Sequence, residues 1–254
     1  MQSCFTYYNT HMYFATIPVR MTAGIPLILS VAPQSAAAAC DADGYTFRMH
    51  ARAIDYLRRA EPRFAPWIER HGLIRLPARR SKDPFLALLE TIVYQQLAGA
   101  AAKAIWTRVV ALFPTGALDA AALLAMPDDD LRSAGLSRGK TLAMKAVAAA
   151  ALAGALPDAL RMRRMTEAQI TAALTPIRGV GPWTVHMLLI FTLRRPDILP
   201  VGDYGIRKGF QMLYRKRALP TPRQLTLAAE RWRPYRTAAC LYLWRIASAP
   251  RATS

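Results

Sequence analysis

The sequence predicts an all-α protein, and three observations lead to that fold class. From Gly44 onward, apolar residues recur almost without interruption at the spacing of amphipathic helices. We find no convincing run of alternating apolar residues that would indicate a half-buried strand. Alanine, the strongest helix former, is frequent. A chain of 254 residues is long enough for one large domain or two small ones.

Residues 1–43 stand apart from this helical pattern. They contain a run similar to a weak signal peptide, MTAGIPLILSVAPQSAAAAC, but no basic segment precedes it and two prolines interrupt its apolar part. We therefore expect residues 1–43 to be disordered, or to lie upstream of the true start of translation. Met21 and Met49 are the alternative starts.

The first helices are predicted from their apolar faces and their caps. MHARAIDYLRRA (49–60) places Ile54 and Leu57 on one face, and a basic loop, IRLPARRSKDP, follows farther along. Asp83 is then an N-cap with Pro84 at the first helical position. The apolar stripe of the helix that begins there is Phe85, Leu88, Leu89 and Ile92.

The next helices are marked by their start and stop signals. AAKAIWTRVVALF (101–113) continues the helical pattern, and Gly135 then ends a short helix. A long helix opens at Ser137. Thr166, with Gln169 three residues later, forms the capping box of another helix.

Two glycines lie between this last helix and the next, in IRGVGPW (177–183). Pro182 opens the second helix at a position where a missing N–H costs nothing. Glycines here let the backbone approach something bulky, and the exposed peptide N–H groups form a phosphate site at the helix N-terminus. An ordinary turn between two helices is the alternative. A dinucleotide fingerprint does not fit, because a third glycine and a preceding strand are both missing.

Asp203 stands in PVGDYG, just before a helix whose apolar face is Ile206, Phe210 and Leu213. An aspartate at that place is usually only an N-cap. An acid in a Pro–Gly loop shortly after a phosphate-binding hairpin is also a candidate catalytic group.

The charge balance favours a polyanion partner. The chain carries 34 Lys and Arg against 16 Asp and Glu, a net charge of +18, and Arg20 is the only charged residue among residues 1–40. The charge therefore belongs to the helical part, which suits nucleic acid, although solubility alone is the alternative. The three cysteines form no CxxC pair, which argues against a zinc site, an iron–sulfur cluster or a disulfide scaffold and favours a reducing compartment. No apolar run is long enough to span a membrane.

IRGVGPWTVHMLLIF followed by PVGDYG resembles the helix–hairpin–helix DNA glycosylase superfamily. ETIVYQQLAGAAAKAIWTRV, AGLSRGKTLAMKAVA and ERWRPYRTAACLYLWRIA resemble its alkylation-repair branch, the 3-methyladenine DNA glycosylase II group. The resemblance runs from about Ile54 to Ala247. It implies two helical subdomains with the active-site cleft between them, which we place at residues 44–83 plus 202–250 and at residues 84–201.

The resemblance implies that Asp203 is the catalytic residue of a monofunctional glycosylase. Bifunctional relatives carry a lysine nucleophile where this chain has Trp183, so no imine with the sugar is expected. The iron–sulfur branch, which includes the mismatch adenine glycosylases, needs a C-terminal cysteine cluster, and only Cys240 is present. A non-catalytic DNA-binding module and a glycosylase of a different lesion class remain the alternatives.

A cationic alkylated purine is selected by stacking on electron-rich rings. Trp183 and Trp244 match positions that line the base pocket in the family, and Tyr94 and Tyr204 are local candidates. Core packing is the alternative for all four aromatic residues. Met187 falls where some relatives have a pocket tyrosine.

The resemblance also implies the DNA contacts. Relatives use the second residue of the pair matched by Gln95 and Gln96 to fill the gap left by the flipped base, and the polar Gln96 departs from the usual leucine. The other candidates for contact with DNA are the hairpin residues Gly179, Val180, Gly181 and Thr184, and the helix-start residues Arg138 and Lys140, for which a solvated face is the alternative.

We expect no cofactor apart from a structural Na⁺ or K⁺ at the hairpin. The resemblance implies that it would bind the backbone carbonyls of Thr175, Ile177 and Val180. The expected function is base excision repair: hydrolysis of the N-glycosidic bond of alkylated purines (3-methyladenine, 7-methylguanine, ethenoadenine) after base flipping. The expected partner is double-stranded DNA with alkylated bases, bound by a monomer in the cytoplasm, at the nucleoid, without membrane association.

Overall fold

The computed structural model describes residues 42–74, 76, 81–113 and 118–249. All regular secondary structure in these residues is helical, which confirms the predicted fold class. Most of the predicted N-terminal extension lies outside the described residues. Within them, no helix has both the length and the apolar character needed to cross a membrane.

The α-helices follow one another along the chain with short connections. They are α1 (Ala42–Ala60), α2 (Ala65–His71), α3 (Pro84–Tyr94), α4 (Gly99–Ala111), α5 (Ala120–Ala125), α6 (Asp128–Ser133), α7 (Arg138–Leu152), α8 (Ala159–Arg164), α9 (Glu167–Leu174), α10 (Pro182–Met187), α11 (Tyr204–Leu213), α12 (Pro222–Ala229) and α13 (Arg236–Ser248). Two 3-10 turns (Pro62–Phe64 and Glu230–Trp232) and a π-helical turn (Leu188–Thr192) complete the list.

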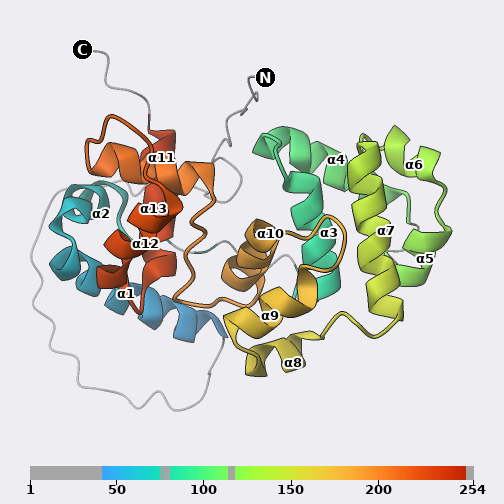
Figure 1. Cartoon of the computed structure of the whole chain (residues 1–254), viewed down its shortest axis with the longest axis horizontal. Coiled ribbons are helices and arrows are strands. Elements are labelled where there is room, and N and C mark those ends of the chain that lie inside the picture. The colour runs from blue at the N-terminus through green and yellow to red at the C-terminus, as the bar shows by residue number, and fades with distance from the viewer. Residues whose placement is uncertain (1–41, 75, 77–80, 114–117, 250–254) are drawn as a thin grey trace, which may run out of the picture.

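The helices gather into two groups, as Figure 1 shows. One group contains α1, α2, α11, α12 and α13, with α11 packed closely on α13. In the other, α3 contacts α4, α7 and α10, and α10 contacts α9. The chain crosses from the second group back to the first between the π-helical turn and α11. The predicted division into residues 44–83 plus 202–250 and 84–201 stays a prediction, as does a cleft between the two parts.

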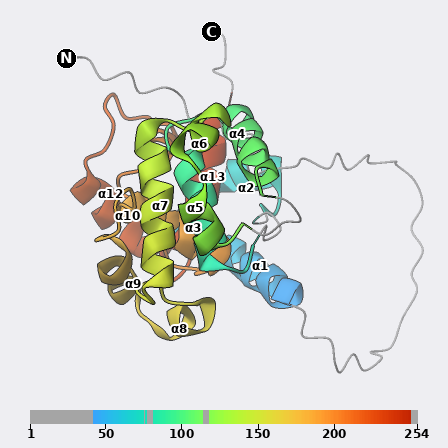
Figure 2. The same ribbon diagram turned by 90° about the vertical axis from the view of Figure 1, so that its right-hand side faces the viewer.

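The α7 helix runs along one face of the second group and packs on α3 and α5 (Figure 2). It begins where the sequence predicts, because the Ser137 hydroxyl accepts the Lys140 N–H. Its buried face includes Met144 and Val147, neither of which is exposed. This helix is therefore a fixed support for the elements that pack against it.

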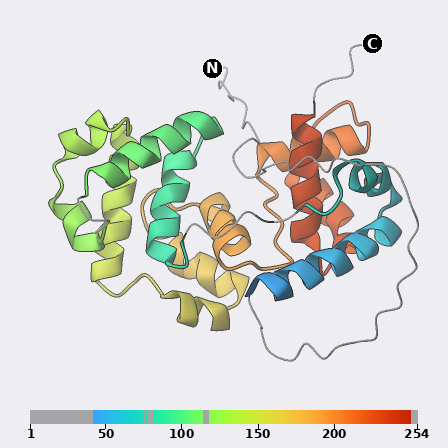
Figure 3. The same cartoon turned by 180° about the vertical axis from the view of Figure 1, so that it is seen from behind.

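The α13 helix supports the first group as α7 supports the second. Figure 3 shows α1 passing across it. A Cβ on Gly209 of α11 would lie only 2.0 Å from the Leu243 carbonyl oxygen of α13. Glycine therefore allows the two helices to touch through their backbones. Nearly every residue of α13 is buried, so this helix is the centre of its group.

The predicted caps are confirmed. Asp83 accepts the Phe85 N–H at 2.9 Å, and both hydrogen bonds of the Thr166–Gln169 capping box are present. The sequence analysis does not predict two of the helices, α5 and α8. Each begins after an aspartate whose side chain accepts the N–H three residues later. An N-cap search restricted to long apolar stripes misses such six-residue helices.

Candidate active site

The hairpin between α9 and α10 contains two glycines that have different roles. A Cβ on Gly179, which has a φ of +84°, would lie 2.2 Å from the Cβ of Ala143 on α7. A Cβ on Gly181 would meet nothing within 4 Å. The bulky neighbour of Gly179 is therefore α7, whereas Gly181 borders open space, and contact of their N–H groups with a phosphate stays a prediction.

Three of the residues predicted to contact DNA make contacts that hold the hairpin in place. Val180 is 3% exposed and its N–H donates to the Ile177 carbonyl at 3.0 Å. Gln95 Nε2 donates to the Gly179 carbonyl at 3.0 Å and to Thr184 Oγ1 at 2.9 Å. The side chains of Gln95 and Thr184 are thus bonded to each other, and contact of these residues with DNA stays a prediction.

Lys140 is bonded within the protein, and its contact with a phosphate stays a prediction. Its Nζ donates to the Val93 carbonyl at 2.6 Å and to the Gln95 carbonyl at 2.9 Å, at the C-terminal end of α3. Burial lowers the pKa of this ammonium to about 8. Arg138, two residues earlier at the first position of α7, is exposed, and its contact with DNA stays a prediction.

Two of the residues predicted to contact DNA, Gln96 and Gly181, face outward, and they lie in two neighbouring loops. Gln96 is exposed at a φ of +56°, at the turn between α3 and α4. Gly181 stands at the N-cap of α10, whose first-turn N–H groups have no partner within the helix. Gln95, which joins the two loops, connects Gln96 to the hairpin.

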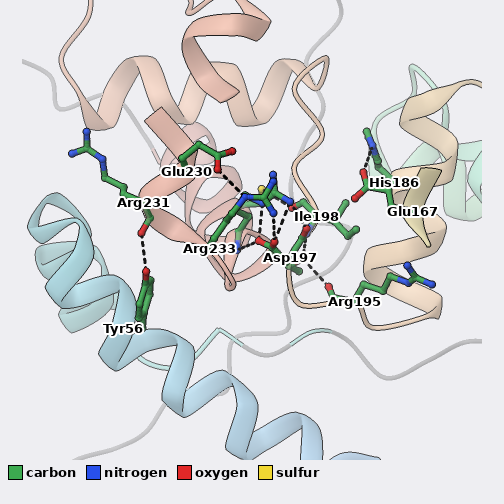
Figure 4. A network of polar contacts seen from close by, with 12 residues as sticks. Tyr56, Glu167, His186, Arg195, Asp197, Ile198, Glu230, Arg231 and Arg233 are labelled. Carbon is green, nitrogen blue, oxygen red and sulfur yellow. Dashed lines mark hydrogen bonds and ion pairs between the residues drawn. The ribbon is translucent and has the colours of Figure 1, made fainter. Parts of the chain in front are cut away.

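The hairpin helices are also joined by a polar contact. His186 of α10 lies 3.2 Å from Glu167 of α9 (Nε2 to Oε1), as Figure 4 shows. The hydrogen bond from His186 lowers the pKa of the Glu167 carboxyl. The relative position of the two helices is therefore fixed by a side-chain contact as well as by the turn.

Asp203 is 6% exposed and its carboxylate accepts three N–H groups. Trp183 Nε1 donates to Oδ2 at 2.7 Å. Trp244 Nε1 donates to Oδ1 at 2.9 Å, and the Ile206 N–H donates to the same oxygen at 2.8 Å. The last of these is the N-cap bond of α11, so Asp203 is both a cap and a buried carboxylate with fixed oxygens.

The two tryptophans reach Asp203 from different parts of the fold. Trp183 comes from α10 of the hairpin, and Trp244 comes from α13. Trp244 also stacks on Phe191, with ring centroids 5.8 Å apart. A Cβ on Gly205 would lie 2.8 Å from Trp244 Cδ1, so glycine is needed for α11 to start beside this ring. The sequence predicts both tryptophans at the site but not their bonds to the carboxylate.

The loop that leads to Asp203 is anchored to the start of α13 through Asp197 (Figure 4). Arg236 Nε donates to Asp197 Oδ1 at 2.7 Å, and Arg236 Nη2 donates to Oδ2 at 3.1 Å. Arg233 Nη1 reaches Oδ2 at 2.7 Å. Because Arg236 is only 8% exposed, this pair is largely shielded from solvent.

Two further α13 residues hold the same loop. The Thr237 hydroxyl donates to the Arg195 carbonyl at 2.7 Å and accepts the Ile198 N–H at 3.0 Å. Cys240 Sγ donates to the Ile198 carbonyl at 3.7 Å. Burial and the nearby Asp203 charge raise the pKa of this thiol, so it remains a neutral donor. Arg236, Thr237, Cys240 and Trp244 therefore form one bonding face of α13.

The other residues predicted to line the base pocket are buried or half-buried. Tyr94 is 1% exposed and Met187 is 5% exposed, both within the hydrophobic core. Core packing, the alternative that the sequence left open for Tyr94, is what the structure shows in this conformation. Tyr204 is half-buried at the first residue of α11. Contact of these three residues with a flipped base stays a prediction.

Comparison with known proteins agrees with this geometry. Residues 89–234 match the family model described as HhH-GPD superfamily base excision DNA repair protein. The chain is 34% identical over 165 residues to DNA-3-methyladenine glycosylase 1 of Schizosaccharomyces pombe, covering 65% of this chain and 72% of that protein.

Solved structures give the same relationship. A 3-methyladenine DNA glycosylase of S. pombe in complex with abasic DNA superposes with a TM-score of 0.72 at 32% identity, covering 76% of this chain and 95% of the other. A DNA-3-methyladenine glycosidase of Bacillus halodurans has a TM-score of 0.67 at 32% identity, covering 78% and 89%. With its hairpin, its Pro–Gly loop and its buried aspartate in the order that the sequence predicts, the chain belongs to the HhH-GPD superfamily of base excision DNA repair proteins.

Proposed function

We propose that this protein is a monofunctional DNA glycosylase that hydrolyses the N-glycosidic bond of alkylated purines in duplex DNA. The observation that carries the proposal is the Asp203 carboxylate, buried and held by three N–H donors beside the hairpin. The names of the similar proteins, which are 3-methyladenine glycosylases, support the choice of alkylated bases.

The carboxylate fits the charge that develops in this reaction. Cleavage of the bond between C1′ and the base nitrogen leaves the electron pair on the base and positive charge on the sugar. A carboxylate ~4 Å from that charge contributes about 4 kcal/mol at an effective dielectric constant near 20. Such a contribution corresponds to roughly a thousandfold in rate. Water then adds to C1′ and gives up a proton to the solvent, and the products are the free base and an abasic site.

The leaving group explains why one carboxylate suffices. An N-alkylated purine is already cationic, so it departs as a neutral base without needing a proton from the protein. Trp183 and Trp244 place two indoles next to Asp203, and electron-rich rings favour a cationic base. The same residues would thus orient the carboxylate and select the substrate.

Trp183 also supports the monofunctional assignment. It occupies the place where bifunctional relatives have a lysine, and its indole nitrogen donates to Asp203. An indole N–H is not a nucleophile, so it forms no imine with the sugar. We therefore expect no covalent protein–DNA adduct after borohydride treatment, and an abasic strand that stays uncleaved until alkali is added.

DNA binding would be carried by the outward-facing loops. Gly181 and the first-turn N–H groups of α10 suit a phosphate, and Gln96 at the neighbouring turn suits the duplex beside it. The net charge of +18 adds a salt-dependent attraction to the backbone. Binding as a monomer, at the nucleoid in the cytoplasm, completes the proposal.

A Na⁺ or K⁺ at the hairpin fits the donor set but is a lesser part of the proposal. Carbonyl oxygens of Thr175, Ile177 and Val180 are the hard donors that such ions take. The Ile177 carbonyl already accepts the Val180 N–H and keeps a second lone pair. Such an ion would neutralise carbonyl dipoles next to a bound phosphate.

The deciding experiment is release of 3-methyladenine from methylated duplex DNA by the purified protein and by Asp203→Asn. Asparagine keeps the N-cap of α11 but cannot accept N–H bonds at both former oxygens, so one indole loses its acceptor. We expect a loss on the order of a thousandfold in single-turnover rate. Binding to undamaged duplex should be retained. A folded Asp203→Asn protein with near-normal turnover would refute the assignment of Asp203.

A further inference from the structure

We propose that Lys140 is a positioning residue for the reaction, acting through Gln95 on the hairpin and on the tryptophan that holds Asp203. The inference rests on the proposed glycosylase function. It assigns to Lys140 a role different from the phosphate contact that its basic character first indicates.

The Lys140 ammonium lies at the C-terminal end of α3. Lys140 projects from the first turn of α7 and donates to the Val93 and Gln95 carbonyls at 2.6 and 2.9 Å. The last carbonyls of a helix lack partners within it, and a cation there is favoured by the helix dipole. Lys140 thus ends α3 and fixes the turn at which Gln96 is exposed.

The Gln95 side chain connects the end of α3 to the hairpin. While its backbone carbonyl accepts from Lys140, its Nε2 donates to the Gly179 carbonyl and to Thr184 Oγ1. One residue therefore ties the end of α3 to both sides of the hairpin. We call Lys140 and Gln95 together the α7 brace.

The hairpin in turn connects to the Asp203 carboxylate through Trp183. Thr184, 1% exposed, directly follows Trp183, whose indole donates to Asp203 Oδ2 at 2.7 Å. Gly179 contacts α7 at Ala143, three residues after Lys140 and on the same side of that helix. The brace and this contact together hold α10, and with it Trp183, at a set position relative to α7.

A phosphate ligand and a positioning residue make different predictions for Lys140→Met. A phosphate ligand supplies affinity, so its loss weakens binding and reduces the slope of log affinity against log salt by ~0.9. A positioning residue supplies geometry, so its loss lowers the rate of the bound complex, and small displacements cost on the order of tenfold to a hundredfold.

The experiment measures base release at saturating protein, in single turnover, together with affinity for undamaged duplex across salt concentrations. For Lys140→Met we expect at least a tenfold lower rate and an unchanged salt slope. Lys140→Arg, which keeps the donors, should restore much of the rate. Wild-type rate with a reduced salt slope would show that Lys140 binds phosphate and would overturn the proposal.

Gln95→Met tests the other half of the brace. It removes the Nε2 donor but leaves the backbone carbonyl for Lys140, so it should lower the rate by a similar factor. The double variant should be no worse than the poorer single variant, because both act through one unit. Losses that multiply would mean independent roles and would contradict the brace. If Lys140→Met does not fold, Gln95→Met and Lys140→Arg still decide the question.

Hydrogen exchange separates this inference from the proposed function. In Lys140→Met, the amides at residues 96–97 should exchange faster than in the wild type, whether or not the protein releases bases. Arg138→Met, an exposed change on the same helix, is the matched control and should leave exchange unaltered. A wild type that releases no base would refute the glycosylase proposal, whereas unchanged exchange in Lys140→Met would refute the brace.

Discussion

The loop that carries Asp203 and the hairpin that precedes it are both irregular backbone, yet they are held by different interactions. The Asp203 loop is bound to α13 by an ion pair at Asp197, by a hydroxyl and by a thiol, all largely buried. The hairpin packs on α7 at Gly179, which has no side chain, and is bonded to the end of α3 by the amide of Gln95.

This difference follows from what each region must present. In the proposed function Asp203 stabilises developing charge, which requires a fixed carboxylate, and its loop is bonded to α13 at Arg195, Asp197 and Ile198. A loop that binds phosphate, as we propose for the hairpin, needs exposed N–H groups and little bulk, and the hairpin is supported at Gly179 and open at Gly181. Trp183 joins the two regions, because it belongs to α10 and bonds to Asp203.

The largest expected effect is on the Asp203 loop, from Arg236→Met. Removal of this nearly buried guanidinium leaves the Asp197 carboxylate with a weakened partner set, and breaking such a pair costs about 3 kcal/mol of unfolding free energy. Arg233→Met is the control, because that side chain is 47% exposed and should cost less than about 1 kcal/mol. Urea denaturation measures both, and equal losses would contradict the anchoring role of Arg236.

The hairpin should be most sensitive at Gly179. Alanine there adds a Cβ 2.2 Å from that of Ala143 at a φ of +84°, and we expect a loss of about 2–3 kcal/mol in unfolding free energy. Gly181→Ala should be nearly neutral in stability. Adding Ala143→Gly should restore the part due to the clash but not the part due to φ. Thermal unfolding in which both glycine variants behave alike would show that the hairpin does not depend on α7.

The sequence predicts the hairpin because its signals are local. Gly181–Pro182, the Thr166–Gln169 capping box and Asp83–Pro84 each lie within a few residues, and backbone sterics decide them. The fold class follows from the same kind of signal, since helical periodicity needs no tertiary information.

The contacts of the site could not be predicted in the same way. Asp203 is bonded by residues 20 and 41 positions away, and Lys140 by carbonyls 45 and 47 positions away. Backbone acceptors such as the Gln95 carbonyl leave no mark on residue type. A lysine at a helix start therefore looks like a phosphate ligand, although here it ends another helix.

Reaction rate should distinguish the two tryptophans that meet at Asp203. Trp183→Phe removes the donor recorded at Oδ2, whereas Trp244→Phe leaves Oδ1 with the Ile206 amide. We expect a larger rate loss for Trp183→Phe, on the order of tenfold to a hundredfold, and a larger stability loss for the more buried Trp244→Phe. Single-turnover base release and urea denaturation measure the two effects. The reverse order would mean that α13, rather than the hairpin, positions the reacting oxygen.

Gly181→Asp tests whether the open side of the hairpin meets phosphate. The added carboxylate would face the phosphate and should weaken binding to damaged and undamaged duplex alike, because backbone contacts carry no sequence information. We expect a loss of about tenfold in affinity, a shallower salt dependence and an intact fold, since nothing lies within 4 Å of the new Cβ. Gly181→Ala is the control for bulk. If folded Gly181→Asp binds duplex with wild-type affinity at every salt concentration, the hairpin is only a turn between two helices and does not bind phosphate.

The smallest expected effect is a pH dependence at the α7 brace. Burial lowers the pKa of Lys140 from 10.5 to about 8, so between these values the unfolded chain binds the proton and the folded protein does not. Stability rises with pH wherever the unfolded state holds more protons. The wild type should therefore gain stability relative to Lys140→Met from pH 8 to 10.5, by about 1 kcal/mol once solvent screening of this half-buried group is allowed for. The comparison cancels titrations common to both proteins, such as that of Tyr242, and urea denaturation at several pH values measures the difference. A difference that stays flat across this window would mean that the two carbonyls hold the proton on Lys140 as firmly as water does, and the brace would then be a charged contact throughout.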